Sequence, residues 1–172
     1  MGKNFRCRCK MTSDATRKFT EQIASCQGII VKICRLYGRD EEDRNDLRQD
    51  VLLNAWTSFH QFRGESKFST WLYKVALNTA ISRLRKNRVP VRPLEGFHDV
   101  VPELASEKAA QAELLSALMR HLSDHEKAIV ALYLDELSYA EIADITGLSE
   151  TNVGVKLNRI KLKLKKLIQH EH

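Results

Sequence analysis

Basic side chains gather near the end of the chain, where Glu150 is followed by no acidic residue up to Ile168. The cations of this stretch are Lys156, Arg159, Lys161, Lys163, Lys165 and Lys166. Lysine and arginine neutralise phosphates, and small polar or apolar side chains among them can read base edges. We therefore expect a surface for duplex DNA, formed by Thr151, Asn152, Val155, Lys156, Asn158, Arg159 and Lys163.

Two helices must position this surface. Ser138 and Glu141 form a capping box that predicts a short helix over residues 139–146, and Gly147 supplies a left-handed turn after it. Ser149 can cap a second helix that runs to about Ile168. Its buried stripe would be Val153, Leu157, Ile160, Leu164 and Leu167. This pattern predicts a helix-turn-helix whose second helix docks in the major groove; the alternative is an ordinary helical hairpin with a solvated basic face.

Further helices are expected before this unit. Ser123 and Glu126 form another capping box, which predicts a helix carrying Ile129, Val130 and Leu132. A helix over residues 103–121 should precede it, with Leu114, Leu115 and Leu118 facing inward.

The first half of the chain also has helical periodicity. A stripe formed by Phe19, Ile23, Cys26, Ile30, Ile33 and Tyr37 predicts one helix of about 24 residues, which Gly38 would end. A second helix should start near Asp40, whose acidic neighbours suit a helix N-terminus. Ser69 can cap a third helix, which ends in a basic stretch.

Residues 88–103 contain all three prolines and predict a domain boundary. We expect an all-α chain with a disordered arm over residues 1–11, a helical domain over 12–88, a flexible linker over 89–103 and a second helical domain over 104–172.

Composition restricts the remaining possibilities. Lysine and arginine outnumber aspartate and glutamate by 28 to 22, which suits a polyanionic partner. No apolar stretch is long enough for membrane insertion, and no secretory signal is evident, so we expect a reduced, cytoplasmic protein. Cys7 and Cys9 lack the further ligands that a metal site needs. No glycine loop for phosphate or nucleophile motif points to an enzyme, and no cofactor or metal is expected.

Two blocks of sequence resemble the bacterial RNA polymerase sigma factors of the small extracytoplasmic-function type. The first block comprises Asp46–Trp56, Phe62–Gly64 and Phe68–Asn78, and the second comprises Leu122–Leu132, Leu137–Ala143, Gly147–Ser149 and Asn152–Val153. The resemblance implies a dissociable initiation subunit that binds core RNA polymerase, double-stranded promoter DNA and the melted −10 strand. It also implies an anti-sigma partner.

The resemblance assigns roles to particular residues. Those expected to bind polymerase are Asp46, Gln49, Asp50, Leu52, Leu53 and Trp56. Those expected at the −10 element are Phe62, Arg63, Gly64, Lys67, Asn78, Arg83 and Arg85. The C-terminal helix would read the −35 element, although Gly154, Val155 and Asn158 depart from the pattern of better-known members.

Alternative interpretations remain open from the sequence. The aromatic residues Trp56, Phe68 and Trp71 recur at helical spacing, which favours a role in the core. The acidic helix with Asp46 and Asp50 could be a solvated face. The chain as a whole could be a conventional helix-turn-helix regulator with an N-terminal dimerisation or sensing domain.

Overall fold

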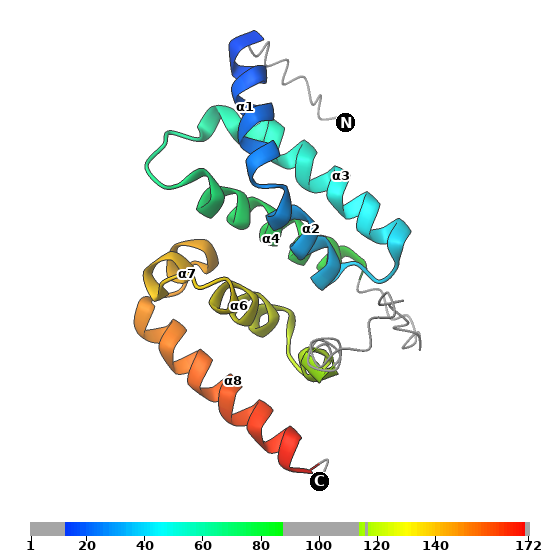
Figure 1. Cartoon of the computed structure of the whole chain (residues 1–172), viewed down its shortest axis with the longest axis vertical. Helices are drawn as coiled ribbons and strands as arrows, with labels where there is room; N and C mark the ends of the chain where they lie inside the picture. The colour runs from blue at the N-terminus through cyan, green and yellow to red at the C-terminus, as the bar shows by residue number, and fades with distance from the viewer. Residues whose placement is uncertain (1–12, 88–113, 116, 171–172) are drawn as a thin grey trace, which may run out of the picture. The chain divides into compact units, whose positions relative to one another are not determined.

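The computed structural model describes residues 13–87, 114–115 and 117–170, and every regular element among them is a helix (Figure 1). The all-α expectation is confirmed. The chain divides into two compact units, residues 1–83 and 84–172. None of the described helices is long and apolar enough to cross a membrane. The predicted arm, Cys7 and Cys9, and the predicted linker lie outside the described residues.

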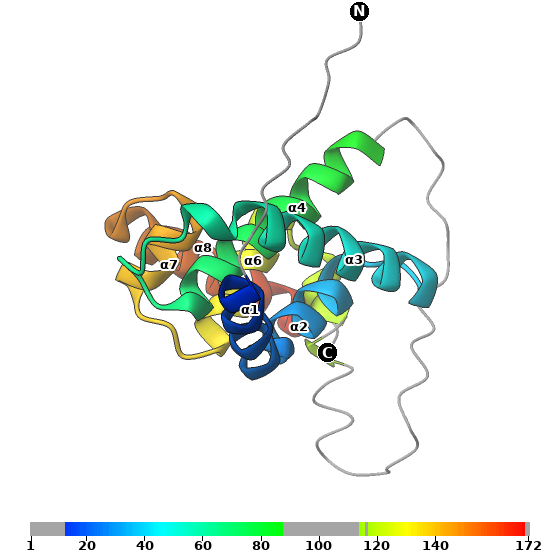
Figure 2. The ribbon, with the colours of Figure 1, turned by 90° about the horizontal axis from the view of Figure 1, so that it is seen from above.

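Unit 1 begins with two helices where the sequence predicted one. α1 (Ser13–Ser25) and α2 (Gln27–Tyr37) run in different directions from Cys26, as Figure 2 shows. The Ser25 hydroxyl donates to the Gln22 carbonyl at 2.8 Å, and the Cys26 amide donates three residues back, to Ile23, at 3.0 Å. Hydrogen bonds of this span tighten the turn and interrupt the α-helical series. The prediction of a continuous helix was therefore wrong at this point.

α2 ends at Gly38, as predicted, although the backbone there is extended, with φ −82° and ψ 136°. A Cβ at Gly38 would lie 2.5 Å from Cγ of Arg44, so close packing rather than a left-handed turn requires glycine. Asp40 then caps α3 (Glu41–Ser58) by accepting from the Asp43 amide at 2.8 Å. The predicted start of this helix is confirmed.

A 3₁₀ turn, η1 (Phe59–Gln61), and a loop connect α3 to α4 (Phe68–Asn87). The two helices run antiparallel (Figure 1). α4 begins one residue before the predicted cap Ser69, and its first hydrogen bond joins the Trp71 amide to the Lys67 carbonyl at 3.1 Å. Ser69 was therefore wrongly predicted as the cap, because the first helical turn closes on Lys67, two residues earlier. The most buried side chains of unit 1 include Ile33, Leu47, Val51, Leu72 and Ala76.

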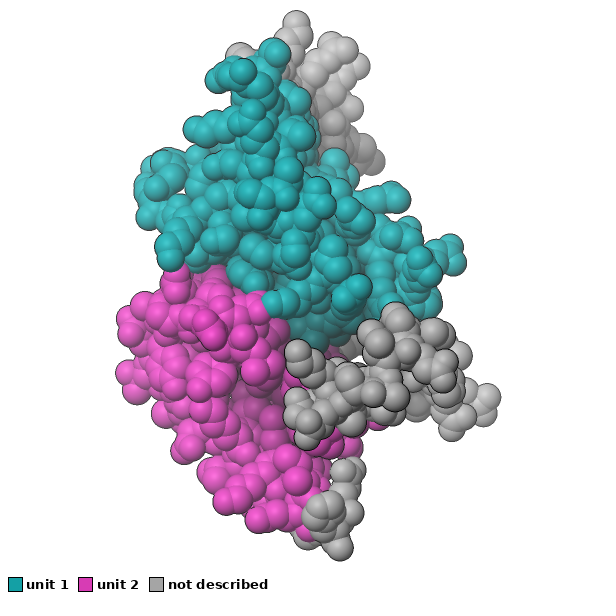
Figure 3. Space-filling view, viewed as in Figure 1, with its two compact units in different colours: residues 1–83 teal, residues 84–172 magenta. Residues whose placement is uncertain are grey.

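Unit 2 (magenta in Figure 3) has a helical stretch at 114–115 and 117–120, followed by α6 (Asp124–Leu134). Leu118 is buried, but Leu114 and Leu115 are 45% and 40% exposed, so their predicted inward position is wrong. Apolar side chains are common on protein surfaces, and helical spacing alone did not distinguish these two. The capping box is confirmed, since the Ser123 amide donates to the Glu126 carboxylate at 2.8 Å.

α6 ends in a turn that the sequence did not reveal. The Leu137 amide donates to the Leu132 carbonyl at 3.3 Å, and the Glu136 amide donates to the Tyr133 carbonyl at 3.0 Å. This is the Schellman arrangement, which places one residue in the left-handed region. Here that residue is Glu136, with φ 59°, rather than the usual glycine.

α7 (Tyr139–Thr146), the turn at Gly147 and α8 (Glu150–His170) confirm the predicted helix-turn-helix. Ser138 and Glu141 form the predicted capping box, with the Ser138 amide donating to the carboxylate at 3.0 Å. Gly147 has φ 73°, and Ser149 Oγ accepts from the Asn152 amide at 3.3 Å. The turn at Gly147 and the cap at Ser149 thus set the angle between α7 and α8.

The two left-handed helix ends predict opposite effects of substitution. Glu136→Gly should raise the free energy of unfolding by about 1 kcal/mol, because glycine carries no Cβ penalty at positive φ. Gly147→Ala should lower it by about the same amount for the same reason. Chemical denaturation followed by circular dichroism measures both. A loss of stability in Glu136→Gly would contradict this account of the α6 terminus.

Candidate nucleic-acid interface

α8 presents the face that the sequence predicted for DNA. The six predicted residues in its first three turns are all exposed: Thr151, Asn152, Val155, Lys156, Asn158 and Arg159. Val153, Leu157 and Ile160, which alternate with them, are at most 2% exposed. Burial of one side against α6 and α7 therefore leaves the other side available to base edges and phosphates.

Four of the six basic residues of α8 lie on one side of the helix. Lys156, Arg159, Lys163 and Lys166 recur at intervals of three and four residues, so they form one cationic stripe along the helix. Lys163 also lies 3.5 Å from the Glu126 carboxylate of α6, which ties the middle of this stripe to the core of the unit. Repeated cations along one face are what contact with a phosphate backbone requires.

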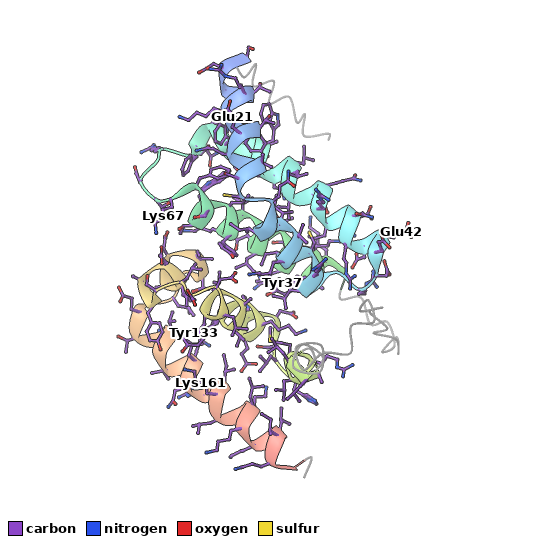
Figure 4. The ribbon with its side chains drawn as sticks, viewed as in Figure 1. Glu21, Tyr37, Glu42, Lys67, Tyr133 and Lys161 are labelled. Atoms are coloured by element: carbon purple, nitrogen blue, oxygen red, sulfur yellow. The ribbon has the colours of Figure 1, made fainter. Side chains whose placement is uncertain are left out.

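Lys161 lies outside the cationic stripe and points toward α6 (Figure 4). Its Nζ donates to the Tyr133 hydroxyl at 3.1 Å and lies 4.5 Å from the centre of the Tyr133 ring. The hydrogen bond with this hydroxyl raises the pKa of Lys161. This contact was not predicted, because it joins residues 28 positions apart.

Two apolar residues also lie on the outer face of α8. Val155 is 45% exposed and Leu162 is 53% exposed, seven residues apart and hence on one side of the helix. Val155 was predicted as a candidate contact for a thymine methyl group, whereas Leu162 was not singled out. The interruption of the basic pattern at Leu162 was the signal available in the sequence.

Gly154 faces Tyr139 at the start of α7. A Cβ built there would meet the Tyr139 ring, with the nearest carbon at 3.4 Å, which is ordinary van der Waals contact. Of the three residues that depart from the family pattern, Gly154 thus faces Tyr139, and Val155 and Asn158 are exposed.

In unit 1, four of the residues predicted for the −10 strand lie in the loop between η1 and α4, beside a cluster of aromatic rings. Arg63, Gly64 and Lys67 are exposed in the loop before α4, and Gly64 has φ 76°. Phe62, from the same loop, is half-buried and packs on Phe68 and Trp71 at 5.6 and 5.3 Å between ring centres. The loop is thus anchored by one aromatic side chain and exposes its polar residues.

The ring cluster comprises Phe19, Trp56, Phe59, Phe62, Phe68 and Trp71, with adjacent centres 5.0–6.3 Å apart. It joins α1, α3, η1, the loop and α4. Edge-to-face and tilted contacts at these separations are favourable beyond the area they bury. Packing thus accounts for Trp56, Phe68 and Trp71. The contacts of Phe19 with Trp56 and Phe59 were not predicted, because they join residues that are distant in sequence.

Arg83 makes contacts that the sequence did not anticipate. Its guanidinium donates to Asp43 at 2.7 Å, to Asp50 at 2.9 Å and to Asp46 at 3.4 Å. We call these three residues the carboxylate cage. Asp43, Asp46 and Asp50 recur at intervals of three and four on α3, and that acidic spacing was the available signal.

Asp43 is the most enclosed member of the cage, with a side chain 11% exposed. Burial tends to raise its pKa, but the Arg39 amide and the Arg83 guanidinium outweigh that effect and lower the pKa below its ordinary value. A carboxyl group with a lowered pKa stabilises the fold at pH values above the ordinary one, and this stability is lost as the pH falls through the lowered value.

α4 contains two further residues that were predicted to contact the −10 element, and they differ from Arg83 in exposure. Asn78 and Arg85 are exposed, whereas only 23% of the Arg83 side chain is exposed. Between them, Thr79 accepts a hydrogen bond from Asn54 of α3 at 3.0 Å. The structure therefore brings Arg83 to α3 and leaves Asn78 and Arg85 on the surface.

The α3 face, formed by Asp46, Gln49, Asp50 and Leu53, is exposed along its length. Leu53 is 60% exposed, which makes it the most exposed large apolar residue among those described. Leu52 and Trp56 are half-buried, and Trp56 packs on Phe19 in the ring cluster at 5.0 Å. An exposed leucine within an acidic and amide rim is a plausible protein-binding patch.

Comparisons with known proteins agree with this arrangement. The Sigma-70 region 2 family matches residues 23–89, and the Sigma-70 region 4 family matches residues 112–164. The ECF RNA polymerase sigma factor SigM of Mycobacterium tuberculosis is 31% identical over 138 residues, covering 80% of this chain and 70% of that protein. The RNA polymerase sigma factor YlaC of Bacillus subtilis is 33% identical over 133 residues, covering 73% of this chain and 77% of that protein.

Solved structures share the fold. CnrH in complex with the cytosolic domain of CnrY has a TM-score of 0.66 at 23% identity, with 91% of each chain covered. The sigma factor RpoE in complex with the anti-sigma factor NepR, from Bartonella quintana, has a TM-score of 0.68 at 19% identity. That comparison covers 91% of this chain and 99% of RpoE.

The chain belongs to the extracytoplasmic-function family of RNA polymerase sigma factors. It is a subunit without catalytic activity that directs RNA polymerase to promoters, and it binds DNA through the helix-turn-helix of region 4. The alternative of a conventional regulator is not supported, since the match includes region 2 as well as the helix-turn-helix.

Gly154 provides a test of how α8 is held. Gly154→Ala should raise the free energy of unfolding by up to about 1 kcal/mol, because alanine favours helix and its Cβ makes an ordinary contact with Tyr139. Gly28→Ala is a matched control in α2, where an added Cβ meets open space. Thermal unfolding measures both, and a loss of stability in Gly154→Ala alone would show that α8 and Tyr139 tolerate no side chain between them.

Proposed function

We propose that the α3 face, together with Leu52 and Trp56, docks on core RNA polymerase. Leu53 supplies an exposed apolar centre, and Asp46, Gln49 and Asp50 supply a polar rim. Protein interfaces commonly combine an apolar centre with such a rim. The acidic groups favour a basic partner surface, because complementary charge speeds association and excludes other partners.

We propose that the loop before α4 and the exposed end of α4 hold the melted −10 strand. Phe62, Arg63, Gly64 and Lys67 belong to the loop, and Asn78 and Arg85 belong to α4. Single strands bind where cations track the backbone beside aromatic groups. The ring cluster gives the loop a rigid base, and Gly64 at positive φ leaves its backbone open to close approach.

We propose that the outer face of α8 reads the −35 element. One observation carries this proposal: the predicted reading residues are exposed while the residues alternating with them are buried. Asn152 and Arg159 offer hydrogen bonds to bases, Val155 offers apolar contact, and Lys156 and Lys163 offer contacts to phosphates. Together with the −10 contacts, this would give the sigma factor two separate binding sites for a promoter.

We also propose that an anti-sigma factor holds this chain inactive. The similar fold of RpoE is bound by the anti-sigma factor NepR in the Bartonella quintana complex, and this supports the proposal by analogy. We place the action of the chain in the cytoplasm, where bacterial core polymerase meets the chromosome.

Reconstituted transcription tests the docking proposal. The full chain with core polymerase should initiate at specific genomic promoters, and Leu53→Glu should weaken core binding about tenfold or more because it puts a charge at the apolar centre. Val155→Glu adds the same charge to an exposed position of α8, and should impair promoter use while core binding is retained. Equal core binding by Leu53→Glu and the unchanged chain would refute docking through α3.

Arg159→Ala tests the −35 proposal. The variant should bind promoter duplex more weakly, and the slope of log affinity against log salt should fall by about 1, since one phosphate or base contact with a cation is lost. Lys18→Ala is a control with the same charge change on the exposed surface of α1. An unchanged affinity and slope for Arg159→Ala would count against contact with DNA.

A further inference from the structure

Arg83 belongs to α4, and two other residues of this helix, Asn78 and Arg85, are proposed to contact the −10 strand. The Arg83 guanidinium, however, is directed toward α3. It bridges the three members of the carboxylate cage, Asp43, Asp46 and Asp50, at 2.7, 3.4 and 2.9 Å. These contacts span 33–40 residues of sequence and join the C-terminal half of α4 to the N-terminal half of α3. Arg83 is thus a cross-link between two helices.

The contacts of Arg83 oppose binding of a phosphate. Three carboxylates hold one guanidinium, and Asp43 is also held by Arg39 at 3.4 Å. A guanidinium has a planar set of N–H donors that suits carboxylates and phosphates alike. A DNA phosphate would therefore have to displace carboxylates that Arg83 already holds.

The cage overlaps the α3 face. Asp46 and Asp50 belong to both, and their side chains are 59% and 51% exposed, so a partner can reach them while Arg83 contacts them from the side. Leu53 follows Asp46 and Asp50 at intervals of seven and three residues, on the same side of the helix. A residue that orders the two carboxylates therefore also sets the geometry of the surface around Leu53.

Arg83 also reduces repulsion within α3. Like charges three and four residues apart destabilise a helix, and Asp43, Asp46 and Asp50 have this spacing. The guanidinium neutralises part of that charge and restricts the three side chains to one arrangement. Binding to a partner then costs less conformational entropy, because the carboxylates are ordered in advance.

We propose that Arg83 is a positioning residue for docking on core RNA polymerase, acting through Asp46 and Asp50, and that it does not contact promoter DNA. This inference rests on the proposed docking of the α3 face. It reverses the sequence-based expectation for Arg83 and keeps that expectation for Arg85, which is exposed two residues further along α4.

The experiment compares Arg83→Gln with Arg85→Gln in the full chain. Core binding is measured by titrating labelled chain with core polymerase, at a temperature where circular dichroism shows each variant to be folded. Binding of a single-stranded oligo(dT) probe by the holoenzyme, formed at saturating chain concentration, is measured over a series of salt concentrations. Arg83→Lys is a second variant that retains the charge but has no planar fork to bridge three carboxylates.

Arg83→Gln should weaken core binding about tenfold, as coupled charge networks commonly do when their centre is removed. Its salt slope for oligo(dT) should equal that of the unchanged chain. Arg85→Gln should show the reverse, with core binding retained and the slope lower by about 0.7, the value for one phosphate of a single strand. Arg83→Lys should bind core with an intermediate affinity, which keeps the test decisive if Arg83→Gln fails to fold.

The inference is overturned if folded Arg83→Gln, or Arg83→Lys in its place, binds core as tightly as the unchanged chain. A purely structural role would also leave the affinity of the folded variant unchanged. A lower salt slope for oligo(dT) binding by Arg83→Gln would also overturn the inference, because it would show that Arg83 contacts a DNA phosphate. Leu53→Glu distinguishes failure of the docking proposal from failure of the role of Arg83. If Leu53→Glu also binds core normally, docking through α3 is refuted. If Leu53→Glu loses core binding and the Arg83 variants do not, only the positioning role of Arg83 is refuted.

Discussion

The contact between Arg83 and the three carboxylates of α3 constrains how α3 and α4 lie against each other in unit 1. It fixes the C-terminal half of α4 against the start of α3, and the Asn54–Thr79 hydrogen bond and the ring cluster complete the pairing toward the other end. The acidic face and the loop of residues 62–67 extend from opposite ends of this pair. The proposed polymerase-docking surface and the proposed strand-binding loop are therefore held by one helix pair, through long side chains and aromatic rings.

Unit 2 is organised by a different kind of constraint. Its helices begin at serine caps and turn at Gly147, so hydrogen bonds between near neighbours set where α7 ends and α8 begins. The apolar stripe of α8 then determines which side is buried, and the opposite side is left with polar, basic and a few apolar groups. Lys161 and Lys163 show that some cations serve the fold as well, since they contact Tyr133 and Glu126 of α6.

This contrast explains which features were predictable from the sequence. The capping boxes at Ser123 and Ser138, the Gly147 turn and the outward residues of α8 depend on neighbours within a few positions, and the sequence predicted them correctly. The helix break at Cys26 and the left-handed backbone of Glu136 depend on particular hydrogen bonds, and the residue types at these positions do not predict them. Arg83 resembled a DNA-binding residue because its basic neighbours are local, whereas its carboxylate partners are distant in sequence. Phe19 joins the ring cluster for the same kind of reason, since its partners come from α3 and η1.

Polymerase and promoter should engage different exposed faces of this sigma factor. Hydroxyl-radical footprinting of side chains can follow both, with the full chain alone, with core polymerase, and with core polymerase plus promoter DNA. Leu53 should lose reactivity when core polymerase is added, and Val155 and Leu162 should lose it only when the promoter duplex is present. Continued reactivity of Leu53 in the holoenzyme, or an unprotected α8 in the promoter complex, would contradict this division of the surface.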